Sequence, residues 1–379
     1  MKTEHAQPET GANSFAAMNN RIGRVVADAI GRTLRDRGVS RMLIALLVAF
    51  GFFAVMKPQI FLGPINLQNI MVAAPEVGVI AIAMMLAMLT GGIDLSLVSI
   101  ANLSAVTMST LFTIMTASSP GLGDSMTIPI VLLGLLVGAA CGLLNGLLIS
   151  LVGITPILAT LATMQILNGI AIVWTGGKTL YGAPAALTTF GKTAIGPVPM
   201  LFIVFVLVAI VIATVVRSTA LGRKLELQGA NPVAARFSGI PSRSVLISSY
   251  TIGGLLAGLA GVLFLCRNPT ASADYGASYV LLVIVIAVLG GTNPNGGFAT
   301  VAGVVLATLT LQVVSSGFTA LRLSPYQYSI AQGVILVVVM ILDTIDWSRP
   351  KWRKRGVTTD SASLQTTQVG TIKKDKEQE

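Results

Sequence analysis

The chain has 379 residues, of which 54% are hydrophobic and 11% are charged, and its mean hydropathy is +0.82. A soluble domain carries roughly 25% charged residues and needs them to cover its surface, so this composition excludes a soluble fold and indicates an integral membrane protein. The formal net charge is +10. The basic residues gather beside apolar segments rather than in a stripe on a folded domain, which argues against nucleic acid as a partner.

Residues 1–40 precede the first apolar segment and are polar and basic. Residues 18–37 have the spacing of a short basic amphipathic helix, and a solvated tail explains them equally well. The leader is too long for the n-region of a signal peptide, so no cleavable signal is predicted. We assign these residues to a cytoplasmic N-terminal tail.

Apolar segments of about 20 residues follow, which is the length that a bilayer core requires. They predict a transmembrane domain over residues 41–347. The ten expected spans, with one more or fewer allowed, are 41–57, 67–90, 94–117, 127–151, 155–175, 199–217, 244–266, 277–290, 297–317 and 326–346. Gly91–Gly92 and Gly290–Gly291 interrupt long apolar stretches and indicate breaks inside helices. The expected fold class is all-α, a polytopic transmembrane helix bundle of about ten spans with some broken helices.

Three basic clusters indicate the orientation of this bundle, at residues 21–41, 217–243 and 349–355. Ten spans put both ends of the chain and the loop after the sixth span on one side, so all three clusters share that side. The opposite loops carry only scattered cations: Lys57, Lys178, Lys192, Arg267 and Arg322. Cytoplasmic loops are enriched in Lys and Arg, so both termini are expected in the cytoplasm. Residues 348–379 are polar and are expected to form a disordered cytoplasmic tail.

Small residues recur in the spans at helical spacing, as in Gly134, Gly138, Gly142 and Gly146. Such positions let helix backbones approach closely in lipid. The spacing fits tight packing within one bundle and also fits a dimer seam, and we favour packing within the bundle.

No catalytic or metal-binding constellation is visible in the sequence. His5 is the lone histidine and lies in the polar tail, and the two cysteines have no metal-site spacing. Gly177-Lys178 resembles the end of a phosphate-binding loop, but the glycine required five residues earlier is replaced by Ile172. We therefore expect no catalytic residue, no metal and no nucleotide or other cofactor in this chain.

Asp94 lies in a long apolar stretch, directly after Gly91–Gly92. A charge inside the membrane is costly unless it is paired or hydrated, which makes Asp94 a candidate for the solute pathway, together with nearby Ser96. Asp94 can equally cap a helix that begins near Leu95. The two roles are compatible and stay open.

Uncharged polar side chains also lie within the spans: Asn102, Asn145, Gln165, Asn168 and Gln312. Amides can bind sugar hydroxyls through paired donors and acceptors. They can also join helices by hydrogen bonds, and this structural role is favoured for each of them.

The loop 217–243 differs from its surroundings because it mixes charged and apolar residues. The apolar ones recur at helical spacing: Val233, Phe237 and Ile240. Asn231-Pro232 is a suitable helix start, and Gly239 followed by Pro241 is a suitable stop. The sequence predicts a short amphipathic helix whose apolar face packs on the bundle, on lipid or on a partner protein.

Taken together, these motifs resemble the permease subunits of bacterial ATP-binding-cassette (ABC) importers for monosaccharides, of the ribose, arabinose and autoinducer-2 type. The stretches that carry the resemblance occur in a consistent order over roughly residues 42–346. They are Gly92-Ile93-Asp94-Leu95-Ser96, Gly142-Leu143-Leu144-Asn145-Gly146, Ile154-Thr155-Pro156, Thr160-Leu161-Ala162-Thr163-Met164, Gly229-Ala230-Asn231, Ala234-Ala235-Arg236 and Ser238-Gly239-Ile240, with a weaker match at Leu289-Gly290-Gly291-Thr292.

The resemblance implies a transport subunit of the bacterial inner membrane that does no chemistry on its solute. Its expected partners are an ABC ATPase subunit that binds the ATP, a periplasmic solute-binding protein, a second permease copy or paralogue, and membrane lipid. The expected solute-pathway residues are Asp94, Ser96, Asn145, Thr155 and Asn168. The residues expected to dock the ATPase are Gly229, Asn231, Ala234, Ala235, Arg236 and Gly239.

Two departures from the family pattern concern the solute rather than the architecture. Leu97-Val98-Ser99 replaces a usual Val-Gly-Ser, and no acidic residue follows Tyr275-Gly276 closely. The alternative function is a secondary transporter driven by an ion gradient. A membrane enzyme is a third class, without a supporting pair of motifs.

Overall fold

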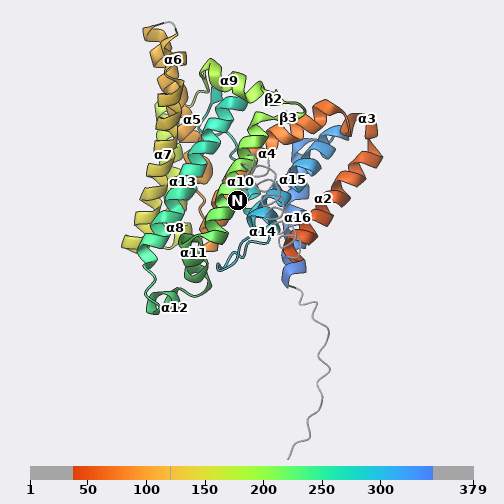
Figure 1. The fold of residues 1–379 in the computed structure, drawn as a ribbon. Helices are drawn as coiled ribbons and strands as arrows, with labels where there is room; N and C mark the ends of the chain where they lie inside the picture. Colours follow the sequence, from red (N-terminus) through yellow and green to blue (C-terminus); the bar gives the residue numbers. More distant parts are fainter. Residues whose placement is uncertain (1–36, 120, 345–379) are drawn as a thin grey trace, which may run out of the picture. The chain divides into compact units, whose positions relative to one another are not determined.

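The structure is a computed structural model that describes residues 37–119 and 121–344. The predicted tail over residues 348–379 lies outside the described residues, as does nearly all of the predicted tail over residues 1–40. Contacts discussed below lie within the compact unit that ends at Val337. Within the described residues the chain is almost entirely helical (Figure 1), so the expected all-α bundle is confirmed.

The described residues contain nine long helices. They are α2 (Arg37–Met56), α4 (Pro64–Leu89), α5 (Leu97–Ser118), α7 (Thr127–Leu147), α8 (Pro156–Thr175), α10 (Met200–Ser218), α13 (Ser242–Arg267), α15 (Val301–Ala320) and α16 (Pro325–Thr344). The π-helical turn η1 (Leu148–Val152) extends α7. Among the described residues, eight helices are long and apolar enough to cross a membrane, and α16 is not one of them.

The expected eighth span is a short helix, α14 (Tyr279–Leu289), of 11 residues. At 1.5 Å per residue it is roughly 16 Å long, which is too short to cross a bilayer alone. The prediction of a full span over 277–290 was therefore wrong. The apolar content of the segment does not reveal its short helical length, because a half-length helix inside a bundle is as hydrophobic as a complete one.

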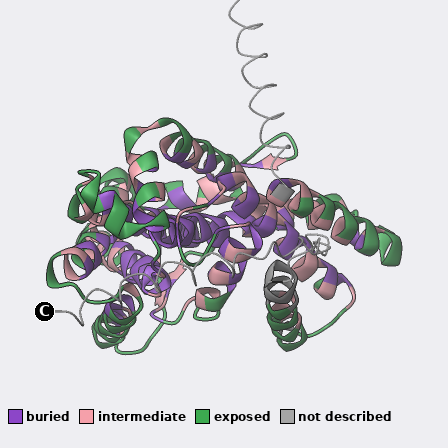
Figure 2. Cartoon of the chain, turned by 90° about the horizontal axis from the view of Figure 1, so that it is seen from below, coloured by how far each residue is buried: buried purple, intermediate pink, exposed green. Residues whose placement is uncertain are grey.

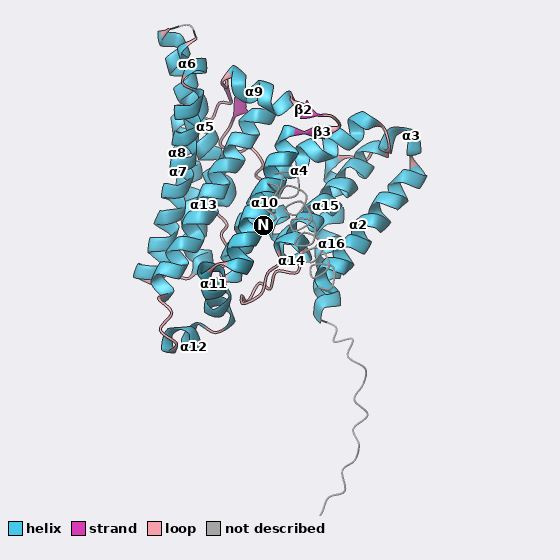
Figure 3. Cartoon of the chain, in the orientation of Figure 1, coloured by secondary structure: helices cyan, strands magenta, loops and turns pink. Residues whose placement is uncertain are grey.

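Short elements lie at the two ends of the long helices. At one end are α3 (Pro58–Phe61), α6 (Leu122–Ser125), α9 (Ala185–Lys192) and two pairs of strands, and at the other are α11 (Ala220–Ala230) and α12 (Pro232–Phe237) (Figure 1). Strand β1 (Leu180–Tyr181) pairs antiparallel with β4 (Thr270–Ala271), and β2 (Ala194–Ile195) pairs with β3 (Val198–Pro199) (Figure 3).

The core consists of α4, α5 and α13, which the other helices surround. In the most apolar part of α4, 83% of the residues are buried, whereas in that of α2 only 11% are buried. Figure 2 shows the buried residues gathered at the centre and the exposed ones around them. The outer face is apolar, with exposed side chains such as Val173 and Ile128. Such a surface suits a lipid environment.

Helices α7 and α13 pack backbone against backbone along the predicted glycine series. A Cβ on Gly138 would lie 2.5 Å from the carbonyl oxygen of Gly254, and a Cβ on Gly146 would lie 2.9 Å from the Cα of Ile247. Gly134 instead faces the side chain of Met108 of α5. The favoured interpretation, packing within one bundle, is confirmed.

The two double-glycine breaks have the same backbone geometry. At the end of α4 the amide of Gly92 donates to Ala87 O at 3.1 Å, and at the end of α14 the amide of Thr292 donates to Ala287 O at 3.0 Å. Gly91 and Gly291 have φ values of +83° and +86°, which glycine adopts without strain. The two glycine pairs therefore end α4 and α14, and non-helical segments follow them before α5 and α15, so the expected breaks inside continuous helices are instead helix ends.

Candidate solute pathway and coupling surface

Asp94 lies in the turn between α4 and α5 and is 1% exposed. Its Oδ1 accepts hydrogen bonds from the Ser96 amide at 3.0 Å and from the Ser96 hydroxyl at 2.6 Å. Helix α5 begins at Leu97, three residues later than the predicted span, because Asp94 and Ser96 close this turn first. Asp94 therefore orders the approach to the helix rather than capping it directly.

Asn145 of α7 joins the same group. Its Nδ2 donates to Ser96 Oγ at 2.7 Å, and Ser96 and Asn145 are fully buried. Three of the five predicted pathway residues thus form one hydrogen-bonded chain that links two helices. Asp94 Oδ2 and Asn145 Oδ1 are buried and have no hydrogen-bond partner among the described residues. The hydrogen-bonded side chains are therefore enclosed by the surrounding helices.

Thr160 and Tyr250 belong to this region, although sequence reasoning gave neither a role. Thr160 Oγ1 accepts from the Leu95 amide at 3.1 Å and donates to Pro156 O at 2.8 Å, which ties α8 to the break. The buried Tyr250 hydroxyl lies against Gly92. Thr160 could have been identified from the sequence as a polar residue one turn after Pro156, whereas nothing in the sequence links Tyr250 to Gly92.

Thr155 and Asn168 of the predicted pathway set lie apart from this chain, on α8. Thr155 is exposed at the start of the helix, and its side chain makes no capping hydrogen bond. Asn168 is half-buried, and its Oδ1 has no partner within the described residues.

The predicted short helix is present as α12 and has the expected ends. Asn231 Oδ1 accepts from the Ala234 amide at 3.0 Å, Pro232 is the first helical residue, and Gly239 has φ +75° just after the helix. Val233 is 65% and Phe237 is 89% exposed, so neither side chain packs on the bundle. An uncovered apolar face at this end of the helix bundle suits contact with another surface.

The six predicted docking residues divide into two groups. Asn231, Ala234, Arg236 and Gly239 are exposed. Gly229 and Ala235 are buried, so they support the surface from inside rather than contribute to it. Sequence reasoning also missed the preceding helix α11, whose N-cap Thr219 accepts from the Gly222 amide at 3.2 Å.

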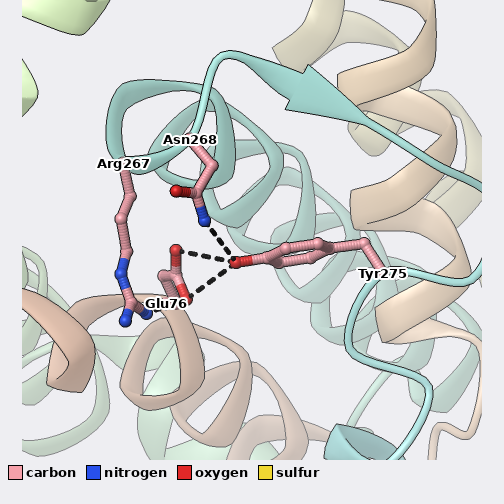
Figure 4. A network of polar contacts seen from close by, with 4 residues as sticks. All are labelled: Glu76, Arg267, Asn268 and Tyr275. Atoms are coloured by element: carbon pink, nitrogen blue, oxygen red, sulfur yellow. Dashed lines mark hydrogen bonds and ion pairs between the residues drawn. The ribbon is translucent and has the colours of Figure 1, made fainter. Parts of the chain in front are cut away.

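A second polar cluster, which sequence reasoning missed, joins α4 to the end of α13 (Figure 4). Arg267 Nη1 donates to Glu76 Oε2 at 2.7 Å, and the Tyr275 hydroxyl lies 3.3 Å from both carboxylate oxygens. Asn268 Nδ2 donates to Tyr275 Oη at 3.4 Å. Glu76 is fully buried inside a span, a signal that the sequence alone contained.

No group of three or more His, Cys, Asp or Glu side chains that could hold a metal ion occurs in residues 37–119 and 121–344. The polar clusters consist instead of amides, hydroxyls and one ion pair. These groups can bind and orient a polar solute, and none of them is arranged as a nucleophile with a base.

Comparison with known proteins identifies the architecture. Residues 66–340 match the family described as "Branched-chain amino acid transport system / permease component". The galactose/methyl galactoside import permease of Escherichia coli K12 is 31% identical over 84% of this chain and 96% of its own length. The ribose import permease of Bacillus subtilis 168 is 29% identical over 90% of this chain and 98% of its own.

A further relative is the autoinducer 2 import system permease of Yersinia enterocolitica, which is 31% identical over 72% of this chain and 82% of its own. The comparison with solved structures found no match. Permeases of this kind are multi-pass inner-membrane proteins that work with separate ATPase subunits and solute-binding proteins. The chain belongs to this permease family and is a transmembrane subunit of an ABC importer, in which ATP hydrolysis takes place on other subunits.

Proposed function

We propose that the chain forms part of the import pathway for a neutral monosaccharide or a related polyol, delivered by a periplasmic binding protein. The observation that carries this proposal is the similarity, over nearly the full length, to permeases named for galactose/methyl galactoside and for ribose. The family description mentions branched-chain amino acids instead. The individual relatives are named for sugars or autoinducer 2, and we give them the greater weight.

The pathway residues we propose are the five expected from the sequence: Asp94, Ser96, Asn145, Thr155 and Asn168. The hydrogen-bonded chain of Asp94, Ser96 and Asn145 supports this, because it links two helices beside a break. Its two buried acceptors without partners suit solute hydroxyls or water once the helices part.

The ATPase is proposed to dock on the exposed part of the α11–α12 segment. The uncovered Val233 and Phe237 and the exposed Arg236 support this role. This segment would then lie in the cytoplasm with both termini, as the basic clusters indicate. A second permease, either a copy of this chain or a paralogue, is proposed to complete the pathway within the lipid bilayer.

Uptake into proteoliposomes tests the function. The permease, its ATPase and its binding protein are reconstituted together, with ATP on the ATPase side and radiolabelled galactose, ribose or leucine on the other. We expect sugar uptake that requires ATP and all three components. Leucine uptake, or sugar uptake driven by a proton or sodium gradient without the ATPase, would contradict the proposal.

A further inference from the structure

The segment between α13 and α14 begins with β4, paired with β1, and continues as irregular backbone to membrane depth at the start of α14. Helix α14 ends at Leu289, and the loop after it reaches the inner end of α4, where the Gly297 amide donates to Leu89 O at 3.0 Å. Tyr279, at the other end of α14, therefore lies roughly 16 Å from that level, and Glu76 lies roughly 20 Å along α4 from Leu89 at 1.5 Å per residue. Both positions are near the middle of α4, which is roughly 39 Å long by the same measure.

The chain descends to this depth after β4. Thr270 and Ala271 still pair with β1, and the Ala273 carbonyl accepts a 2.7 Å hydrogen bond from Asn102 Nδ2 of α5. Non-helical backbone is tolerated at membrane depth only where it is buried in protein or lines a water-filled cavity. The polar cluster joins Tyr275 of this segment to Glu76 in the middle of α4 and to Arg267 and Asn268 at the end of α13, before β4 (Figure 4).

The cluster has a closed side and an open side. Glu76 is fully buried, whereas the Arg267 side chain is 34% exposed and Asn268 is exposed. A guanidinium carries five N–H donors, and only Nη1 of Arg267 donates to a described residue, namely Glu76. The remaining donors and the Asn268 Oδ1 acceptor are available on the open side.

The chemistry of this open side fits a sugar. Guanidinium N–H groups donate to hydroxyl oxygens, and an amide oxygen accepts from a hydroxyl. Tyr275 stands against Phe264, with ring centroids 4.7 Å apart, and 6.4 Å from Tyr279, so apolar ring surface lies beside the polar groups. Polar groups that converge beside aromatic surface are typical of small-molecule sites.

The net charge of the cluster favours neutral solutes over anionic ones. Glu76 neutralises Arg267, so the cluster has no net charge to attract a carboxylate or a phosphate. An anionic solute that took Arg267 would leave Glu76 buried and uncompensated, which is strongly unfavourable. A neutral polyol can bind without disrupting the ion pair.

We propose that Arg267, Asn268 and Tyr275, oriented by Glu76, form a subsite for a neutral polyhydroxylated solute between the end of α13 and the middle of α4. This subsite rests on the proposed sugar function and extends it, because it assigns the solute to a cluster outside the five expected pathway residues. Glu76 acts as a positioning residue that fixes the guanidinium and sets the charge of the site.

The test uses the reconstituted complex with its binding protein and a galactose derivative that carries a diazirine. Irradiation during ATP-driven uptake should label the peptide that contains residues 268–279. Asn268→Ala should lower galactose uptake about three- to tenfold, the loss expected for one hydrogen bond. The matched control is Asn295→Ala, which removes an exposed asparagine at the α14–α15 break and should leave uptake and labelling unchanged.

Glu76→Gln separates a solute subsite from a purely structural tie between α4 and α13. It leaves Arg267 with an uncompensated positive charge, so galacturonate should displace the labelling in this variant and not in the unaltered protein. A structural tie alone would reduce stability without this new competition by an anion.

The outcomes discriminate between the two levels of the proposal. Galactose uptake without labelling of residues 268–279, or with an Asn268→Ala variant equal to its control, would overturn the subsite and leave the import function intact. Absence of ATP-driven uptake of any sugar would overturn the proposed function, and the subsite with it.

Discussion

Ser96 holds together two polar side chains that the sequence separates widely. Its hydroxyl donates to Asp94 and accepts from Asn145 in a fully buried setting. Each of the three is recognisable in the sequence as a polar residue in an apolar stretch. Their contact is not, because spacing along the chain carries no information about which faces of α5 and α7 meet.

Replacement of Ser96 by alanine should therefore destabilise the protein. It removes hydrogen bonds from two buried groups, and each unsatisfied group costs about 1–3 kcal/mol. We expect a lower thermal midpoint in detergent, measured by intrinsic fluorescence. Ser104→Ala is the matched control, because the equally buried Ser104 hydroxyl has no partner among the described residues. Equal midpoints for the two variants would refute the role of Ser96.

Glu76 illustrates a different limit at the residue scale. Its position inside an apolar span was a signal that the sequence-based prediction passed over, and its meaning depends on Arg267 and Tyr275, nearly 200 residues away. Arg267 resembled an isolated loop cation because it follows the predicted span directly. Only the packing of α13 on α4 makes the two residues a pair.

At the scale of elements, the ends of three segments meet at one glycine. Gly229 near the end of α11 faces the Leu89 carbonyl and the Gly297 amide, so that a Cβ there would lie 2.5 Å from Gly297 N. The positive-φ residue Gly296 is also close, since a Cβ on it would lie 2.8 Å from the Gly229 carbonyl oxygen. The proposed docking segment is thereby connected directly to both helix breaks.

Gly229→Ala should impair the importer although alanine favours helices. Within an exposed helix, alanine in place of glycine stabilises by about 1 kcal/mol. At position 229 the added methyl group meets backbone, which cannot move aside locally, so the sign should reverse. We expect a lower thermal midpoint and at least a several-fold loss of ATP-driven uptake. Gly169→Ala on α8, where nothing lies within 4 Å, should be neutral or stabilising. A stabilised Gly229→Ala variant with full uptake would contradict this account.

Helix α12 carries the second prediction at this scale. Arg236→Glu reverses an exposed charge beside Phe237 and should reduce co-purification of the ATPase, while the thermal midpoint of the isolated permease stays unchanged. Lys192→Glu makes the same change at the opposite end of the bundle, in α9, and should not affect co-purification. Equal recovery of ATPase with both variants would count against docking on α12.

The elements differ in how well the sequence predicted them. Helix ends marked by Gly or Pro, such as those at Gly91, Pro156 and Pro232, fell close to their predicted places because these residues restrict the backbone. Helix α11 was missed, since its mixed composition gives no apolar stripe wide enough to detect. Its stability comes from packing on the bundle through buried Leu225 and Gly229.

At the scale of the whole molecule, the fold follows from composition more surely than any site does. The shortage of charged residues and the apolar segments of about 20 residues require a membrane bundle, and the basic clusters favour one orientation. In the structure the α11–α12 segment and the α9 and β2–β3 elements lie at opposite ends of the long helices (Figure 1). The two ends should therefore face opposite sides of the membrane.

Reporter fusions test this orientation. A green fluorescent protein fused to the C terminus should fluoresce, because it folds in the cytoplasm. An alkaline phosphatase fused after Lys192, between α9 and β2, should be active, because it requires the periplasm. Fusion of the same phosphatase within the α11–α12 segment, after Ser238, is the internal control and should be inactive. Two active phosphatase fusions would be incompatible with the single crossing that α10 makes between them. An inactive fusion after Lys192 together with an active fusion after Ser238 would mean that the bundle has the opposite orientation. The exposed Phe237 face would then lie outside the cytoplasm, where no ATPase could reach it.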